Sequence, residues 1–325
     1  MKSTATAPSN IAFIKYWGRK DEVLRLPENG SISMNLDNLL TTTTVAFDDG
    51  LDRDEVTING TQIPRESERV TRHLDLIRAR AGITARARVS SVNNFPTGTG
   101  LSSSASGFAA LTVAACAAAG LSLSERDLSI IARQGSGSAC RSIPSGFVEW
   151  LDGNTSDDSY AVSLYGPDYW DIADVVAVVN QGRKDIPTSE GMQSARTSPF
   201  FSVRSARMEE KLAAVRDALA RRDFNALGEL AEQEALEMHA IMMTSQPSLL
   251  YLLPGSVSVM RVVRRLRQNG LPVYFTLNTG QDVHVITEKH NIGALERELR
   301  GMNEVQQVIV NHPGKGARPV ETHLF

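Results

Sequence analysis

The chain contains 325 residues, of which 42% are hydrophobic and 22% charged, a composition typical of a globular protein with room for two domains. Its 34 basic residues nearly balance 37 acidic residues, which argues against a nucleic-acid-binding protein. The longest uncharged stretch, residues 95–124, is too rich in Ser, Thr, Gly and Ala to predict a membrane span. The two cysteines show no metal-ligand or disulfide pattern, and no signal peptide is apparent, so we expect a cytoplasmic protein.

The first half of the chain is predicted to mix strands and helices. Strands are expected at residues 4–16, 41–47, 55–60 and 85–95, with a turn at Asn59-Gly60. Apolar residues recur at helical spacing over residues 67–82, which predicts an amphipathic helix that ends at Gly82. A Gly/Ser-rich loop then opens an Ala-rich helix ending near Ala119, and a helix over 123–137 is expected to begin at Ser124.

The second half begins with strands and becomes mainly helical. Strands are expected between residues 146 and 180, and long periodic helices at 202–223, 224–243 and 256–270. Two strands follow around the turn at 278–281, then a helix at 291–300 and a short strand at 304–310. Sheet and helix are mixed in both halves without regular βαβ alternation. This pattern predicts an α+β fold with domains at 1–185 and 186–325.

The most informative stretch is NNFPTGTGLSSSASGFAAL, residues 93–111, a loop of small residues that leads into a helix. Glycines let the main chain approach an anion closely, and the free N–H groups at a helix N-terminus favour negative charge. Serine hydroxyls can also bind phosphate or Mg²⁺. No Gly-Lys-Ser/Thr follows, so this is not a Walker A loop. The composition predicts a phosphate-binding loop or, as the alternative, a linker or a small-residue packing surface.

Two single cations lie among residue types that suit an anion-binding site. Lys15 is flanked by Ile14 and Tyr16, and it either extends along apolar surface or pairs with an anion. Arg141 lies in GSGSACRS, where a fork-shaped donor and several hydroxyls can converge on one anion. A Gly/Ser-rich helix end gives the same pattern. The residues alone leave both alternatives open.

Taken together, four motifs resemble those of the mevalonate diphosphate decarboxylase group of the GHMP small-molecule kinases. They are APSNIAFIKYWG (7–18), NFPTGTGLSSSASGFAAL (94–111), GSGSACRS (135–142) and GMQSARTSPFF (191–201), in the family's order and at about its spacing. The resemblance covers essentially the whole chain. It implies a two-domain α+β fold with a cleft between the domains, often a homodimer. It also implies that ATP, with Mg²⁺, phosphorylates the C3 hydroxyl of a mevalonate 5-phosphate ester, which then loses phosphate and CO₂.

The resemblance implies roles for individual residues. The ATP-phosphate loop would comprise Pro96, Gly98, Gly100, Leu101, Ser102, Ser103, Ser104 and Ser106, with Ser103 and Ser104 as candidate Mg²⁺ ligands. Residues matching substrate-binding positions are Tyr16, Arg19, Ser136, Ser138, Arg141, Ser189 and Glu190. Arg141 would bind the C1 carboxylate, and Lys15 would lie near the reacting C3 hydroxyl. Arg69 and Arg72 are candidate ligands of the C5 phosphate, the alternative being an exposed helix face.

The stretch FTLNTGQDVHVIT, residues 275–287, departs from the family, whose usual corner is Asp-Ala-Gly-Pro-Asn. Aligned on Gly280, Asn278 replaces the catalytic Asp and Asp282 replaces the Asn. An amide carries no charge and cannot accept the hydroxyl proton. Three hypotheses follow. Asp282 projects into the site and takes over the role; C3 is phosphorylated without an aspartate, with decarboxylation or as a 3-kinase; or Asn278 disables the protein.

His284 and Glu190 raise two further questions. His284 lies two residues beyond Asp282 on the same face of a strand, and it either pairs with Asp282 or is an ordinary strand histidine. Glu190 stands where an Arg often helps to bind the diphosphate, and a carboxylate there repels a diphosphate more than a monophosphate. We therefore expect 5-phosphomevalonate, converted to isopentenyl phosphate, ahead of 5-diphosphomevalonate. The alternatives are a kinase of mevalonate or its phosphate, and an inactive ligand-binding relic of the fold.

Overall fold

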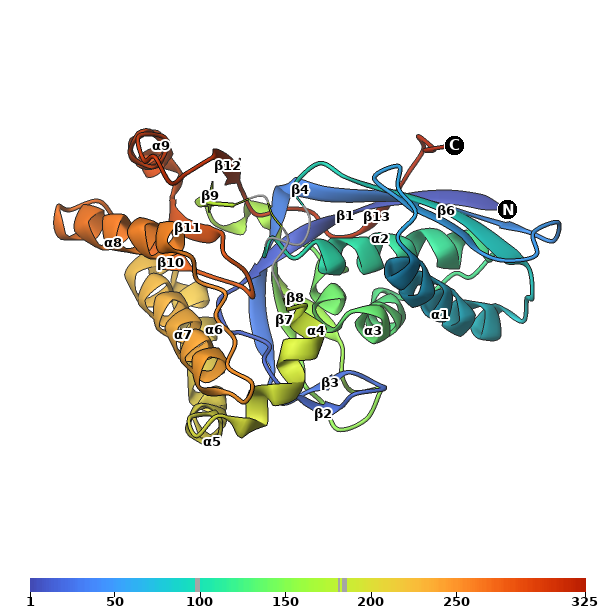
Figure 1. Cartoon of the computed structure of the whole chain (residues 1–325), viewed down its shortest axis with the longest axis horizontal. Coiled ribbons are helices and arrows are strands. Elements are labelled where there is room, and N and C mark those ends of the chain that lie inside the picture. The colour runs from blue at the N-terminus through green and yellow to red at the C-terminus, as the bar shows by residue number, and fades with distance from the viewer. Residues whose placement is uncertain (97–99, 181, 183–185) are drawn as a thin grey trace.

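The computed structural model describes residues 1–96, 100–180, 182 and 186–325, which form two α+β units (Figure 1). The first sheet has the order β13–β1–β4–β6–β5, with β7 paired to β4 and β8 to β7. Its strands are β1 (Lys2–Ala12), β4 (Ser31–Asp48), β5 (Glu55–Ile58), β6 (Arg86–Asn93), β7 (Phe147–Trp150), β8 (Ala161–Tyr165) and β13 (Arg318–Val320). A short hairpin of β2 (Arg19–Asp21) and β3 (Leu26–Pro27) follows β1.

The first unit carries its helices on one face of the sheet, α1 (Pro64–Ala81), α2 (Ser103–Ala118) and α3 (Glu125–Gly135) (Figure 1). Helix α2 is buried along most of its length against β1 and β4, because its alanines let the main chains approach closely. As predicted, α1 ends at Gly82, which has a left-handed conformation, and Ser124 caps α3 by accepting the Asp127 N–H. These helices fix the position of the loop that precedes α2.

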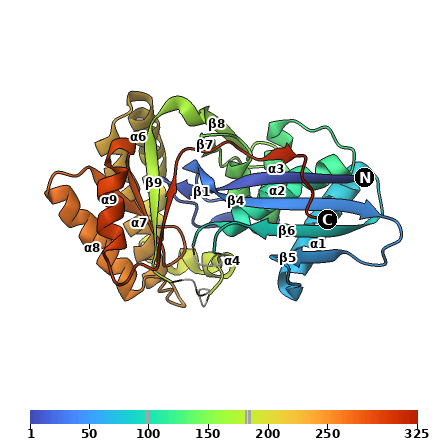
Figure 2. The ribbon, with the colours of Figure 1, turned by 90° about the horizontal axis from the view of Figure 1, so that it is seen from above.

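The second unit has a four-stranded sheet in the order β10–β11–β9–β12. Its strands are β9 (Ile172–Val178), β10 (Val273–Thr276), β11 (Val283–Glu288) and β12 (Gln307–Asn311), and its helices are α4 (Thr188–Gly191), α5 (Phe201–Ala206), α6 (Met208–Arg221), α7 (Phe224–Thr244), α8 (Pro254–Gln268) and α9 (Ile292–Arg300). Helices α7 and α8 contact β10 and β11, while α9 contacts β9 and β12. Figure 2 shows α8 and α9 on the side of β9 that is away from the first unit. In the described part of the chain, no helix is both long and apolar enough to cross a membrane.

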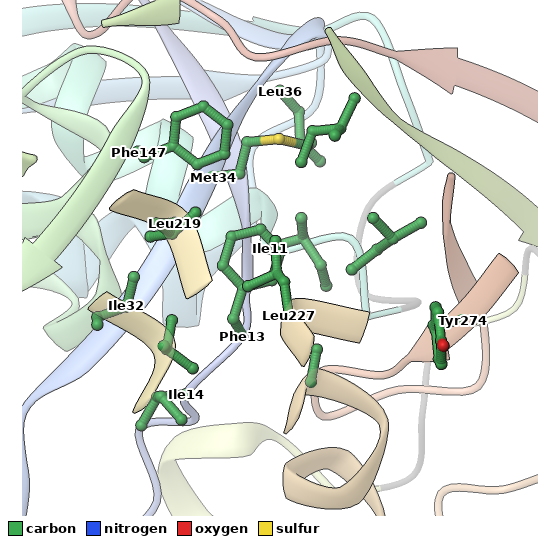
Figure 3. Close-up of a cluster of buried hydrophobic side chains, with 14 of the residues drawn as sticks. Ile11, Phe13, Ile14, Ile32, Met34, Leu36, Phe147, Leu219, Leu227 and Tyr274 are labelled. Carbon is green, nitrogen blue, oxygen red and sulfur yellow. The ribbon is translucent and has the colours of Figure 1, made fainter. Parts of the chain in front are cut away.

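A shared apolar core joins the two units (Figure 3). Ile11 of β1 and Met34 of β4 belong to the same buried cluster as Leu219 of α6 and Leu227 of α7. Tyr274 of β10 extends this cluster into the second sheet. Burial of apolar side chains is the main favourable term in folding, so this cluster holds the two units against each other.

The α+β class is confirmed, since sheets and helices occur in both units. The chain enters the second sheet with β9 and returns to the first with β13. The division at 1–185 and 186–325 stays a prediction. The β2–β3 hairpin was not predicted, because such short strands show no periodic pattern.

Candidate active site

A pocket of about 330 Å³ lies between the two units and gathers most of the predicted site residues. From the first unit it is lined by the loop before α2, and by Ala12, Lys15, Tyr16, Arg19, Ser136, Gly137, Ser138 and Arg141. Residues 187–189, Met238 of α7, and Asn278 and Thr279 line it from the second unit. Both units therefore contribute polar groups to one space.

One wall of this pocket is the segment Gly100–Ser104, here called the serine loop. Gly100, Ser102, Ser103 and Ser104 line the pocket as predicted, and Ser102 precedes α2 in a left-handed conformation with φ 56°. Gly100 has φ 120°, and a Cβ there would meet the Cα of Gly280 at 2.7 Å. The serine loop therefore contacts the turn at 278–282 so closely that a side chain at residue 100 is excluded.

Other predicted loop residues lie elsewhere. Ser106 is buried and shares a 2.6 Å hydrogen bond with Thr41, and Leu101 is buried in the core. Neither residue lines the pocket, nor does Pro96. Gly98 lies outside the described residues. The part of the motif that lines the pocket is thus shorter than the motif itself, because Leu101 and Ser106 face the interior.

Arg141 is held at the base of the pocket by neutral oxygen atoms. Its Nε donates to Ser33 Oγ at 3.0 Å, its Nη1 to Ser31 Oγ at 2.6 Å and its Nη2 to Asn10 Oδ1 at 3.2 Å. Burial lowers the pKa of Arg141 from its ordinary value. The guanidinium charge has no carboxylate partner among the described residues, so it remains available to a bound anion. Ser136 and Ser138 line the same region.

Lys15 lies beside Arg141 in the pocket wall, with 1% of its surface exposed. Its Nζ donates to the main-chain oxygen of Ala12 at 2.5 Å. Burial lowers the pKa of Lys15 to about 7. Glu234 and Asp174 oppose this change, whereas the positive charge of Arg141 adds to it.

Arginines and Tyr16 gather at another end of the pocket. Arg19 donates to Tyr16 Oη at 2.8 Å and pairs with Glu22. Arg69 pairs with Glu66 at 3.0 Å and lies 4.9 Å from the ring centre of Phe108.

Arg25 joins this group and was missed from the sequence. It comes from the β2–β3 turn with φ 53°, and its Nε donates to the Gln134 main-chain oxygen at 2.9 Å. Burial, with Arg19 next, lowers the pKa of Arg25 to about 10. Its place in an unpredicted hairpin explains why no sequence signal marked it.

Two predicted substrate ligands are corrected by the structure. Arg72 lies on the outer face of α1, with its side chain 68% exposed and 3.6 Å from Glu68, as the helix-face alternative expected. Glu190 is also outside the pocket, with its side chain 61% exposed and 3.9 Å from Arg65. Ser189 does line the pocket. The argument from charge repulsion by Glu190 therefore loses its structural basis.

The turn at residues 278–282, here called the corner, presents an amide to the pocket. Asn278 lines the pocket and its Nδ2 donates to Ser102 Oγ at 2.9 Å and to the Asn10 main-chain oxygen at 3.3 Å. Asp282 does not line the pocket, which contradicts its projection into the site. Its Oδ1 accepts the Val179 N–H at 3.0 Å and the Asn180 N–H at 3.5 Å.

Two histidines stabilise the surroundings of the corner. His284 pairs with Asp174 of β9 at 2.9 Å, so its carboxylate partner is not Asp282. His239 of α7, which the sequence did not mark, donates from Nε2 to the Asn278 main-chain oxygen at 3.1 Å. Burial lowers the pKa of His239 to about 4, which keeps this imidazole neutral at pH 7. His239 therefore fixes the main chain of the corner without adding a charge.

The remaining wall is apolar. It is formed by side chains of β5, α1, β6 and α2, namely Val56, Ile58, Val70, Val89, Phe108 and Leu111. Such a surface suits a flat ring rather than a charged group. Clusters of three or more His, Cys, Asp or Glu side chains able to hold a metal ion are absent from the described residues.

Comparisons with known proteins agree with this geometry. The family model for the diphosphomevalonate decarboxylase-like N-terminal domain matches residues 7–161, and that for the mevalonate 5-diphosphate decarboxylase C-terminal domain matches residues 174–319. A diphosphomevalonate decarboxylase of Candida albicans is 36% identical, covering 89% of this chain and 85% of the relative. A phosphomevalonate decarboxylase of Haloferax volcanii is 35% identical and covers 92% of each chain.

A solved structure, MDDEF in complex with MVAPP, AMPPCP and magnesium, superposes with a TM-score of 0.93 and 39% identity, covering 99% of both chains. The predicted family resemblance and two-domain fold are confirmed by these matches. The chain belongs to the mevalonate 5-phosphate and 5-diphosphate decarboxylase family, ATP-dependent lyases of the GHMP kinase superfamily.

Proposed function

We propose that this protein uses ATP to convert (R)-5-phosphomevalonate into isopentenyl phosphate, phosphate and CO₂. The observation that carries the proposal is the distribution of charge in one pocket. The serine loop offers a site for ATP phosphates, Arg141 offers an unpaired cation for the C1 carboxylate, and Arg25 lies at the end suited to a C5 phosphate. Lys15 and Asn278 lie where the C3 hydroxyl would react.

The site residues also fit ATP and Mg²⁺. Ser103 and Ser104 offer hard hydroxyl oxygens, and Mg²⁺ commonly takes its other ligands from phosphates and water. When bound, the ion neutralises charge on the transferred phosphoryl group. The apolar wall formed by Val56, Ile58 and Val89 would hold the nucleotide ring.

A monophosphate is favoured over a diphosphate because carboxylates already neutralise two of the three arginines. Arg19 pairs with Glu22, and Arg69 pairs with Glu66, which itself lines the pocket. Arg25 has no carboxylate partner in the described part of the chain. A phosphomonoester carries about −1.5 to −2 charges at pH 7, and a diphosphate would add charge that this end does not balance.

The second candidate is a kinase of the C3 hydroxyl that does not decarboxylate. It is favoured by one observation, that the residue presented to the pocket by the corner is the neutral Asn278. Without a carboxylate near C3, positive character developing there during loss of CO₂ is less stabilised.

Incubation of the enzyme with ATP and mevalonate, 5-phosphomevalonate or 5-diphosphomevalonate separates these functions. Both ADP and CO₂ are measured, and equal amounts from 5-phosphomevalonate at the highest kcat/KM support the proposal. ADP without CO₂ selects the 3-kinase. Preference for the diphosphate contradicts the monophosphate assignment, and the absence of ADP with all three identifies an inactive protein.

The arginines give a second test, with an exposed arginine as the control. Arg25→Ala should raise the KM for 5-phosphomevalonate about 10-fold or more, because a charge-assisted contact is worth about 1.5–3 kcal/mol. Arg72→Ala removes an exposed arginine outside the pocket and should leave KM within about 2-fold. Equal effects of the two changes would contradict the placement of the phosphate.

The homodimer implied by the family stays a prediction that solution scattering can check.

A further inference from the structure

The pocket offers almost no carboxylate that could accept a proton. Among the described residues that line it, Glu66 alone is acidic, and its carboxylate is paired with Arg69 at 3.0 Å. Asn278 occupies the corner, and its amide donates to Ser102 and to the Asn10 main chain. An amide accepts no proton at neutral pH. Phosphorylation of a hydroxyl nevertheless requires that the hydroxyl proton go to some acceptor.

Lys15 has the surroundings of a neutral amine. Burial is the main cause of its low pKa of about 7, and the charges of Arg141 and Arg204 lower it further, whereas Glu234 and Asp174 raise it. In the described structure its Nζ contacts the neutral main-chain oxygen of Ala12 rather than a carboxylate. At pH 8, therefore, most of the protein carries an uncharged amine at this point of the pocket wall.

A buried group of charges behind the pocket holds the main chain of Lys15 from both sides. Its N–H donates to Glu234 Oε1 at 3.3 Å, and its carbonyl accepts from Arg204 Nη2 at 2.8 Å and from Asn29 Nδ2 at 3.1 Å. Arg204 pairs with Glu234, and Lys211 contacts Glu234 Oε2 at 2.8 Å.

This buried group fixes Lys15 without giving its amine a counter-ion. Burial acts to raise the pKa of Glu234, but the charges of Arg204 and Lys211 outweigh it and lower that pKa. The Glu234 carboxylate is thus ionised and shared between two other cations, and it reaches only the Lys15 main chain. Glu234 and Arg204 are therefore positioning residues for Lys15.

We propose that the neutral amine of Lys15, rather than a carboxylate, accepts the C3 hydroxyl proton while Asn278 serves only to position the serine loop. The proposal rests on the proposed function. As the C3 oxygen bonds to the γ-phosphorus of ATP, the bond from that phosphorus to the bridging oxygen breaks and ADP leaves. The hydroxyl proton is then on Lys15 Nζ as an ammonium.

In decarboxylation the same proton leaves again. The C3–O bond breaks with its electron pair on the phosphate, the C1–C2 bond breaks to release CO₂, and that pair forms the C2–C3 double bond. The Lys15 ammonium returns its proton to the departing phosphate. The amine is then neutral while positive character develops at C3, so the site repels that transition state less than a fixed cation would.

The test is a pH–rate profile at saturating ATP and 5-phosphomevalonate for the wild type and matched variants. Wild-type kcat should fall about 10-fold per pH unit below about pH 7. Lys15→Arg keeps a cation but cannot lose its proton, and should lower kcat about 10²- to 10⁴-fold. The double variant Lys15→Arg/Asn278→Asp should regain ADP formation, because a carboxylate again lies at the corner.

Two outcomes would overturn the proposal. One is kcat of Lys15→Arg within a few-fold of the wild type, and the other is a wild-type profile that is flat from pH 5.5 to 8. Unchanged circular dichroism and AMPPCP binding establish that each variant is folded, with Lys15→Met as the second variant if Lys15→Arg fails this check.

Glu234→Gln should shift the midpoint of the kcat profile to a lower pH than in the wild type, because Glu234 raises the pKa of Lys15. A merely structural role of Glu234 would lower activity without moving the midpoint.

A measurement without turnover separates this proposal from the proposed function. The ¹³Cε NMR shift of Lys15 in free protein labelled with ¹³C-lysine, followed between pH 5 and 11 and assigned by comparison with Lys15→Arg, gives the titration midpoint of Lys15, with exposed Lys289 as the internal reference. A Lys15 midpoint near 7 supports the proposal, whereas one near 10 overturns it. Failure of the wild type to form ADP from any of the three substrates overturns the proposed function instead.

Discussion

The serine loop and the corner contact each other at one pocket, yet their roles differ in kind. The role of the serine loop depends on its backbone conformation, whereas that of the corner depends on a side chain. In the serine loop, Gly100 and Ser102 have positive φ angles and line the pocket, so the proposed binding of phosphate depends on the geometry of the backbone. In the corner, the chemistry depends on one side chain, Asn278. A single substitution at the corner can therefore change the reaction while the fold and the phosphate-binding wall stay the same.

Gly100→Ala should give the largest effect, because it forces the two regions apart. The new Cβ would lie 2.7 Å from the Cα of Gly280, and the φ of 120° is one that L side chains rarely adopt. We expect kcat to fall at least about 100-fold, since displacement of reacting groups by about 1 Å has an effect of this size. Steady-state ADP release and AMPPCP affinity measure the outcome.

The control for this change is Gly293→Ala, on α9 and away from the pocket. A Cβ at Gly293 meets no atom within 4 Å, so this variant should be as active as the wild type and slightly more stable. If Gly100→Ala were equally harmless, close contact between the serine loop and the corner would not be needed for turnover.

Lys15→Met should stabilise the protein at neutral pH, because it removes a buried amine whose protonated form is unfavourable in the folded protein. The pKa of Lys15 is about 7 in the folded protein and 10.5 ordinarily, so between these values the unfolded chain holds a proton that the folded protein lacks. Wild-type stability therefore rises with pH across this range, and below pH 7 the cost is greatest. Lys15→Met removes a cost of up to about 5 kcal/mol.

Urea unfolding at pH 6.5 and pH 10 measures this difference. The advantage of Lys15→Met should be largest at pH 6.5 and should nearly disappear at pH 10. A difference that is constant with pH would mean that Lys15 keeps an ordinary pKa in the folded protein.

Asp282→Asn should have the smallest effect on the chemistry. Asp282 accepts main-chain N–H groups of Val179 and Asn180, and an amide oxygen can accept the same bonds. We expect a loss of about 1–2 kcal/mol in the free energy of unfolding and kcat within a few-fold of the wild type. A loss of several orders of magnitude in kcat, with stability unchanged, would return Asp282 to the catalytic role that the sequence suggested.

These differences explain how far the sequence alone could predict the site. Motifs near Lys15, Ser102 and Arg141 are local, so each was recognised where it stands, and the structure brings all three to one pocket. The direction in which the Asp282 side chain points was not predictable, because it depends on the residue at which β11 begins. That strand starts at Val283, which leaves Asp282 in the turn and bound to the end of β9.

The residues that the sequence did not mark all contact the site from helices that are distant in the sequence. His239 contacts the main chain of Asn278 from another helix, and Arg204 and Glu234 reach Lys15 from α5 and α7. Their neighbours in sequence are ordinary amphipathic helix residues. Only tertiary packing shows that these polar side chains face inward, because helical periodicity marks apolar faces and says nothing of a buried ion pair.

The return of β13 to the first sheet means that this sheet is completed late in synthesis. Arg318, Pro319 and Val320 pair with Thr6, Ala5 and Thr4, so one edge of β1 is covered by residues that are synthesised long after β1. Until then β1 presents an open edge, the kind of surface that recruits other chains into aggregates. The first sheet contains the strand that is synthesised first, β1, but it is complete only when β13 has been added.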